Sequence, residues 1–270
     1  MRMAINKMIE TALGRFQIST NISDDGPLVV FLSGAGQFDT LATYHNVITQ
    51  LPASVNWLTV DYLNTGYSGT AVKDYTLTDE ARAIADIIHT QAAAGVILVA
   101  HSLGGVYALV MAEQLKNVAG FVGIEPTTRE IVLNPPQTAP YQQAATAQAN
   151  WTQDQMEAWL RGHSQREFPD EAAQRLWQSY THSIARLKPV DIQRLTQAMN
   201  SFSWSRTSLT LPVTIPTVIV TEAYRAAEMA RSEYMTANPR SRVITGGSYH
   251  YIHWEKPTLV SQAIMDLVPV

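Results

Sequence analysis

Two patterns of hydrophobic residues alternate along this chain. Short runs of branched aliphatic residues, without polar alternation, predict strands that are buried on both faces of a parallel sheet. The first two runs flank Gly14, and this spacing predicts an antiparallel start to the sheet. The predicted strands cover residues 8–11, 15–20, 28–32, 55–60, 96–100, 120–124, 217–221 and 242–245.

Segments with apolar residues at helical spacing follow most of these strands. Thr76 with Asp79 three residues later predicts a helix start, and Leu77, Ala81 and Ile84 continue one apolar face. The alternation predicts an α/β fold with a mostly parallel central sheet, helices on both faces, and ligands near the carboxyl ends of the strands. Further helices are predicted at residues 39–51, 104–112, 223–237 and 257–267.

The pattern changes between residues 127 and 212. Strand-like runs stop there, and helical segments are predicted instead at 140–150, 151–162, 169–187 and 189–202. The strand–helix alternation then resumes. We therefore predict a core built from residues 1–126 and 213–270, with an all-helical insertion at residues 127–212.

Composition narrows the class of protein. The chain has 270 residues, enough for one α/β domain with an insertion, and 46% of them are hydrophobic. A net charge of -4 argues against nucleic acid or an anionic membrane as the main partner. The chain has no cysteine, which excludes disulfides, a thiolate nucleophile and cysteine-bound metals.

The N-terminal residues and the hydropathy profile do not predict a signal peptide or a membrane span. Residues 1–7 have no apolar core of signal-peptide length, and no later run is long enough to span a membrane. We therefore expect a soluble cytoplasmic protein whose partner is a small-molecule substrate. The sequence does not specify the oligomeric state.

The most informative stretch covers residues 96–105. A run of aliphatic residues ends at Ala100-His101-Ser102-Leu103-Gly104, and a helical run begins at once. A strand that turns directly into a helix leaves no room for large side chains two positions before and after the turning residue, which explains Ala100 and Gly104. Such a turn lifts the Ser102 oxygen clear of the sheet and directs free helical N–H groups toward it. A serine that merely caps the helix is the alternative.

This stretch resembles the nucleophile elbow of the alpha/beta-hydrolase superfamily, whose usual pattern is Gly-x-Ser-x-Gly. Ala100 replaces the first glycine of that pattern. The resemblance extends over roughly residues 8–268 and implies that Ser102 is a nucleophile and that residues 127–212 form a lid. The superfamily's dehalogenases and epoxide hydrolases use Asp at this place, so a serine argues against those two activities.

A small-residue loop at 33–38 follows the strand at 28–32. Its glycines let the backbone pass close to a bound substrate. The superfamily usually has His-Gly-x-x here, with Ser33 in place of that His, and the resemblance implies an oxyanion hole made by the N–H groups of Ala35 and Leu103. A plain glycine-rich turn is one alternative. A phosphate loop is another, although no Gly-Lys-Ser/Thr follows.

A serine hydroxyl needs a base to become a nucleophile. His250 is the best candidate of the seven histidines, because it follows a predicted strand and a loop of small residues. The segment from His250 to Pro257 is similar to the His-x4-Glu-x-Pro pattern that follows the catalytic histidine in many alpha/beta hydrolases. His253, three residues later, is the alternative base.

The acid that would orient the imidazole has two candidates. The superfamily usually places an Asp after the strand at 217–221, where this chain has Glu222. Some members place the acid at the end of the strand after the elbow helix, where Glu125 stands. We favour Glu125 and keep Glu222 as the alternative. Asp61 precedes Ser102 in the chain, and we interpret it as a residue that holds its own loop.

These residues imply acyl transfer by a Ser102–His250–acid triad through an acyl-enzyme, on a small carboxylic ester or a related carbonyl bond, with no metal or cofactor. Two enzyme alternatives remain, an aminopeptidase of the proline-releasing type and a carbon–carbon bond hydrolase. An aminopeptidase would need acids in the insertion to hold the substrate amine. A ligand-binding protein on the same fold is the alternative without catalysis. The candidate acids for an aminopeptidase are Glu130, Asp154, Glu157 and Glu167.

Overall fold

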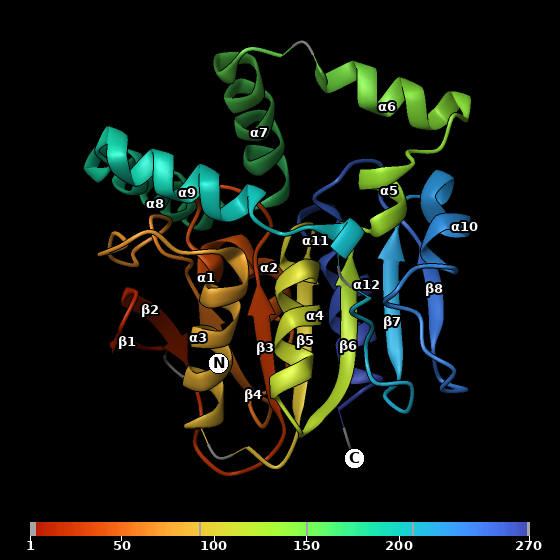
Figure 1. Ribbon diagram of the computed structural model, residues 1–270, viewed down its shortest axis with the longest axis horizontal. Helices are drawn as coiled ribbons and strands as arrows, with labels where there is room; N and C mark the ends of the chain where they lie inside the picture. The colour runs from red at the N-terminus through yellow and green to blue at the C-terminus, as the bar shows by residue number, and fades with distance from the viewer. Residues whose placement is uncertain (1–3, 92, 150, 207, 269–270) are drawn as a thin grey trace.

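An eight-stranded sheet runs through the computed structural model, which describes residues 4–91, 93–149, 151–206 and 208–268 (Figure 1). The strand order is β1-β2-β4-β3-β5-β6-β7-β8. β2 pairs antiparallel with both β1 and β4, and the remaining neighbours are parallel. The α/β fold with a mostly parallel sheet is thereby confirmed. The strands are β1 (Ile5–Thr11), β2 (Gly14–Thr20), β3 (Leu28–Leu32), β4 (Asn56–Val60), β5 (Val96–His101), β6 (Val118–Ile124), β7 (Thr217–Thr221) and β8 (Arg242–Thr245).

Helices cover both faces of the sheet, which explains the uninterrupted aliphatic runs of the central strands. On β3, Val30 packs in the core cluster that contains residues of α3 (Leu77–His89) and α4 (Gly104–Gln114). Its neighbour Val29 points to the other face, into the cluster with residues of α2 (His45–Ile48) and α12 (Pro257–Met265). The helix start predicted at Thr76 is also present, because Thr76 and Asp79 form a capping box at the start of α3.

Two predicted helices are shorter than expected. The segment 39–51 breaks into α1 (Thr40–Thr43) and α2, and the residue between them, Tyr44, is buried and donates its hydroxyl hydrogen to the Leu32 carbonyl at 2.9 Å. The segment 223–237 forms only η2 (Ala223–Arg225) and α10 (Ala226–Met229). The chain turns after Met229 because Tyr234 is fully buried against Phe121 and donates to the Thr127 carbonyl at 2.8 Å.

The segment between β6 and β7 is helical and lies above the carboxyl ends of the parallel strands (Figure 1). Part of it packs on the core, because Trp177 meets Phe38 edge-on at 5.3 Å between ring centroids. The helix predicted at 140–150 was expected to end at Asn150, which lies outside the described residues. The elements are α5 (Arg129–Leu133), α6 (Ala139–Ala149), α7 (Gln153–Glu167), α8 (Asp170–Arg186), α9 (Pro189–Asn200) and η1 (Trp204–Arg206), and α11 (Ile252–Glu255) precedes α12.

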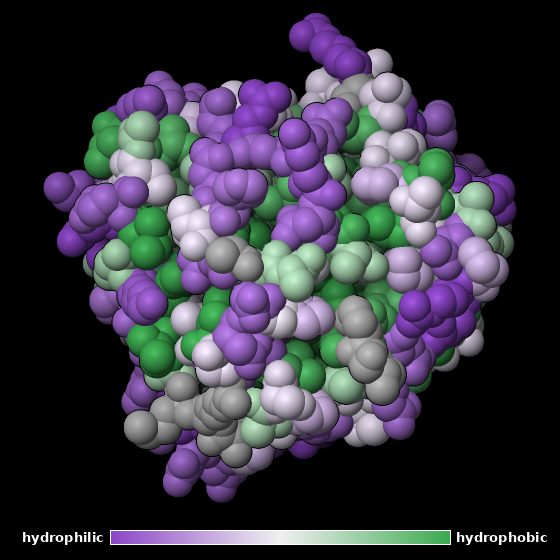
Figure 2. Space-filling view, turned by 90° about the horizontal axis from the view of Figure 1, so that it is seen from below, coloured by the Kyte–Doolittle hydropathy of each residue, from purple (hydrophilic) through white to green (hydrophobic). Residues whose placement is uncertain are grey.

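The opposite end of the molecule, at the amino ends of the parallel strands, mixes hydrophilic side chains with small groups of hydrophobic ones (Figure 2). Residues 1–3, which belong to the N-terminal stretch 1–7 without a predicted signal peptide, lie outside the described chain. In the portion that is described, every helix is too short or too polar to cross a bilayer.

Glu80 on α3 predicts a pH-dependent stability. Its side chain is fully buried and accepts hydrogen bonds from the Leu63 N–H and the Tyr107 hydroxyl, both at 2.6 Å. Burial outweighs these bonds and raises the pKa of Glu80 from 4.5 to about 7. The folded state therefore holds a proton between these values that the unfolded chain has lost, so this group's contribution to stability falls as pH rises from 5 to 8.

We expect Glu80→Gln to remove that dependence, because the amide carries no charge. The free energy of unfolding of Glu80→Gln minus that of wild type should be about 2 kcal/mol larger at pH 8 than at pH 5, because only the wild type loses stability over this range. Urea unfolding at both pH values measures the difference. The exposed Glu113→Gln on α4 is the control, and its difference from wild type should be the same at both values. A Glu80→Gln difference that does not change with pH would contradict the assignment.

Candidate active site

Ser102 lies at the carboxyl end of β5, directly before α4, in the strained left-handed region with φ 50°. Its backbone is held on both sides, since its N–H donates to the Ile124 carbonyl at 3.0 Å and its carbonyl accepts from the Thr127 N–H at 3.0 Å. The predicted need for small neighbours has a measurable cause at Gly104. A Cβ there would lie 2.6 Å from the carbonyl oxygens of Leu32 and Ser33.

The loop at 33–38 lies directly against this serine. A Cβ on Gly34 would be 2.9 Å from Ser102 Cβ and 2.7 Å from His101 Nδ1. The next residue, Ala35, is exposed, and Leu103 is half-buried. The two residues predicted to provide oxyanion N–H groups thus belong to the two segments that meet at Ser102.

The close approach at Gly34 can be tested by alanine substitution. We expect Gly34→Ala to lower kcat/KM about 10- to 100-fold, because the loop must move away from Ser102 and small displacements of positioning groups are costly. Gly36→Ala is a matched control in the same loop, where the nearest atom to a new Cβ is Phe38 Cδ2 at 3.9 Å. Kinetics of both variants on one common substrate measure the effect. Equal losses in the two variants would contradict the role given to Gly34.

His250 follows β8 and a short loop. Its ring lies 4.6 Å from the His101 ring, and its backbone carbonyl accepts from His101 Nε2 at 3.0 Å. Its side chain is 37% exposed. The Glu of the predicted His-x4-Glu-x-Pro pattern has a structural task, because Glu255 accepts the Ser248 N–H at 2.6 Å and so holds the loop that carries His250.

Glu125 directly follows β6 with φ 46°, and its side chain is 1% exposed. Oε1 accepts from the Thr221 hydroxyl and from the Glu222 N–H at 2.7 Å. Oε2 lies 3.8 Å from His250 Nδ1 and 2.7 Å from Arg225 Nη1. Burial opposes the charged form, but the contacts with His250 and Arg225 outweigh it and lower the pKa of Glu125 to about 2. The carboxylate is therefore ionised and faces the imidazole.

Glu222 stands one position past β7, beside Glu125. Its backbone N–H is used by the Glu125 carboxylate, and the pKa of its own carboxyl is raised by burial and by the charge of Glu125. The geometry brings Glu125, rather than Glu222, within 4 Å of His250 Nδ1. Between the two predicted acids it therefore favours Glu125.

His253, the alternative base, is fully buried with its ring 4.8 Å from that of Tyr44. Both of its ring nitrogens lack a hydrogen-bond partner among the described residues, and burial lowers the pKa of His253 to about 3. It packs in the core while His250 is partly open to solvent. The remaining histidines besides His101 lie on helices: His45 on α2, His89 on α3, His163 on α7 and His182 on α8.

Hydrogen bonds do not join the serine, imidazole and carboxylate of the described chain. Within the described chain, no hydrogen bond links Ser102 Oγ to the His250 ring, and the 3.8 Å between His250 and Glu125 exceeds hydrogen-bond length. Catalytic hydrogen bonds are often long without substrate and shorten when it binds. Asp61, interpreted as structural, accepts the N–H groups of Thr40 and Tyr67, both at 2.8 Å.

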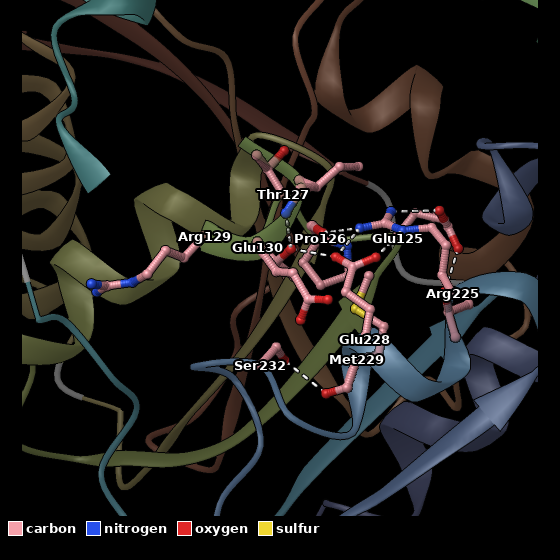
Figure 3. Close-up of polar contacts among 12 residues, drawn as sticks. Glu125, Pro126, Thr127, Arg129, Glu130, Arg225, Glu228, Met229 and Ser232 are labelled. Atoms are coloured by element: carbon pink, nitrogen blue, oxygen red, sulfur yellow. Dashed lines mark hydrogen bonds and ion pairs between the residues drawn. The ribbon is translucent and has the colours of Figure 1, made fainter. Parts of the chain in front are cut away.

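Sequence reasoning missed two charged residues beside this site. Arg225 and Glu228 are each 3% exposed, and Arg225 pairs with both Glu125 and Glu228 (Figure 3). Their spacing of three residues in a predicted helix is typical of a solvent-exposed ion pair. The one available signal was the need of a buried carboxylate for a cationic partner.

A model of the alpha/beta hydrolase family matches residues 29–263. No curated protein matches the sequence. Smu.1393c from Streptococcus mutans is a similar solved structure, with 27% identity, a TM-score of 0.81, and coverage of 98% of this chain and 97% of that one.

Two further solved structures have lower identity and show a common fold. E-2-(acetamidomethylene)succinate hydrolase has 21% identity and a TM-score of 0.63, over 98% of this chain and 99% of that one. A variant of the N-acyl homoserine lactonase AidH has 15% identity and a TM-score of 0.66, over 99% and 98%.

Proposed function

Because the chain belongs to the alpha/beta hydrolase family, we propose that it is a serine hydrolase acting on a small carboxylic ester or a related carbonyl bond. The observation that carries the proposal is Ser102 at a strained strand-to-helix turn, together with an ionised, buried Glu125 that faces His250. A serine at this place does not suit the Asp-dependent chemistry of dehalogenases or epoxide hydrolases.

The proposed reaction has two steps. His250 takes the proton of Ser102 as Oγ attacks the carbonyl carbon, and the N–H groups of Ala35 and Leu103 hold the negative oxygen that forms. His250 then gives the proton to the leaving alcohol. A water molecule, deprotonated by His250, attacks the acyl-enzyme, releases the acid and restores Ser102. Glu125 keeps the imidazole oriented and stabilises its charged form.

We propose that the helices of residues 127–212 act as a lid on the core of residues 1–126 and 213–270. Their place above the carboxyl ends of the strands supports this, because ligands of parallel α/β sheets bind there (Figure 1). The aromatic contact of Trp177 with Phe38 joins α8 to the loop beside Ser102. The shape of these helices would set the chain length of the substrate.

The enzyme alternatives differ in what the insertion must bind. An aminopeptidase needs an acid for the substrate amine, and two of the four candidates are already paired, Glu130 with Arg231 at 3.2 Å and Glu157 with Arg161 at 2.9 Å. Asp154 and Glu167 are the acids left for this role, so the aminopeptidase stays an alternative. A carbon–carbon bond hydrolase remains the second candidate, and a ligand-binding protein is the candidate without turnover.

Labelling with a fluorophosphonate tests the proposal without knowledge of the substrate. Ser102 Oγ should attack phosphorus, expel fluoride and give one adduct, located by mass spectrometry. Release of p-nitrophenol from esters of acetate to octanoate should then stop in the labelled protein, and the preferred chain length measures the pocket. Absence of both labelling and ester turnover would contradict a serine hydrolase and favour ligand binding. Labelling without ester turnover would favour the carbon–carbon or amide substrates.

A further inference from the structure

Arg225 lies between two buried carboxylates. Its Nη1 is 2.7 Å from Glu125 Oε2, while Nη2 and Nε donate to Glu228 Oε1 and Oε2 at 2.9 and 3.1 Å (Figure 3). Nη2 also donates to the Pro126 carbonyl at 3.2 Å. The planar guanidinium is thus fixed on two sides, in a geometry that an ammonium group cannot reproduce.

The partner carboxylate is itself held in place. Glu228 Oε1 accepts from the Thr128 hydroxyl, and Oε2 lies 3.4 Å from the Tyr141 hydroxyl on α6. Burying one isolated charge pair in a fold often brings no stability over apolar residues. A network of three buried charges that ends 3.8 Å from His250 therefore calls for a functional reason.

We propose that Arg225 and Glu228 are positioning residues for the reaction: Arg225 fixes Oε2 of Glu125 in the direction of His250, and Glu228 cancels the charge that Arg225 would otherwise bring to the site. This inference rests on the proposed serine-hydrolase function. Without Glu228, the positive charge of Arg225 would oppose the imidazolium that forms when His250 takes the Ser102 proton.

The other titratable groups that face His250 do not mask the effect of the Arg225 charge. His101 and His253 contact or approach its ring, and burial lowers the pKa of both, so they are neutral near pH 7. Tyr251 lies 5.8 Å from the His250 ring between centroids, and the pKa of its hydroxyl is raised by burial. The carboxyl groups on this side are those of Glu125 and Glu222, and burial and the charge of Glu125 raise the pKa of Glu222. Arg225 is a permanent cation at this site, and its balance by Glu228 decides the charge that His250 meets.

Two variants separate the position of Arg225 from its charge. Arg225→Lys keeps the positive charge but loses the planar, two-sided hydrogen bonding of the guanidinium. The rate of fluorophosphonate labelling of Ser102 should therefore fall about tenfold. The acidic limb, meaning the pH range in which this rate falls as the solution becomes more acidic, should stay in place. Glu228→Gln keeps the volume and loses the counter-charge. Because the imidazolium is then less stable, the acidic limb should move to lower pH by about one unit.

The controls are the same substitutions at surface charges, Arg231→Lys and Glu171→Gln. The native side chains are 62% and 90% exposed. Both controls should leave the labelling rate and the position of its acidic limb unchanged. A limb that does not move, or moves to higher pH, in Glu228→Gln overturns the inference, and so does an unchanged rate in Arg225→Lys. If Arg225→Lys does not fold, the shift in Glu228→Gln decides alone. Absence of labelling at Ser102 in the wild type would overturn the proposed function as well, which distinguishes the two failures.

Discussion

Ser102→Ala should lower kcat/KM for p-nitrophenyl esters at least about 1,000-fold and leave the fold unchanged. The variant removes one oxygen at the end of β5, which is held by backbone hydrogen bonds to Ile124 and Thr127 that do not involve the side chain. Alanine carries the same left-handed φ as serine at this position, so the thermal midpoint should stay within a few degrees of wild type.

Steady-state kinetics on the best ester of the chain-length series, with circular dichroism of both proteins, provide the measurement. Ser205→Ala, at an exposed position far along the chain, is the matched control and should retain full activity. If Ser102→Ala kept activity within tenfold of wild type, hydrolysis would not proceed through this serine. A metal- or general-base-assisted attack of water would then have to be sought.

Glu125→Gln should lower kcat about 1,000-fold, whereas Glu222→Gln should stay within about fivefold of wild type. The amide has no charge to stabilise the imidazolium. An amide NH2 group in the place of Oε2 also cannot accept the hydrogen bond that Arg225 Nη1 donates there at 2.7 Å in the native protein. Glu222 contributes a backbone N–H to Glu125, and this hydrogen bond survives replacement of its side chain.

The two variants are isosteric and one strand apart, so each is the control of the other. Both should be compared at several pH values by kcat and kcat/KM, with unfolding curves to separate loss of stability from loss of catalysis. A large loss in Glu222→Gln with a small loss in Glu125→Gln would assign the acid to the end of β7 instead.

Features that depend on local chain geometry were predictable from the sequence. The turn at Ser102 is one, because an aliphatic run that passes directly into a helical run needs small residues beside the turning residue, and Ala100 and Gly104 stand there. The exact bounds of β7 and β8 are another, since both strands of branched residues end where the next residue is Glu222 or Gly246. Such signals need no knowledge of distant parts of the chain.

The choice between the two acids was not predictable to the same degree. β6 and β7 are neighbours whose register pairs Ile124 with Val220, so Glu125 and Glu222 emerge at the same edge of the sheet. The strand pattern brings both close to the site. The left-handed backbone of Glu125 and the hydrogen bonds it accepts, which depend on tertiary packing, direct its carboxylate to His250.

Arg225 and Glu228 were beyond prediction for a related reason. The sequence predicted one helix over residues 223–237, and an Arg and a Glu three residues apart on a helix typically form a pair at its surface. The buried Tyr234 ends that helix early, and the resulting turn places the pair behind Glu125. A charge in the core is recognisable only when its partner, 100 residues away in the chain, is known.

The strand order also sets a sequence of events in time. β3, β5 and β6 lie side by side at the centre of the sheet and come from the first half of the chain, whereas His250 meets His101 across 149 residues. Contacts between such distant segments require a large loss of chain entropy and form late in folding. When the unfolded chain is diluted into buffer, secondary structure should therefore return before hydrolytic activity does. During synthesis Ser102 leaves the ribosome well before His250, so under the proposed mechanism the nascent chain should stay inert until β8 and the residues after it are made.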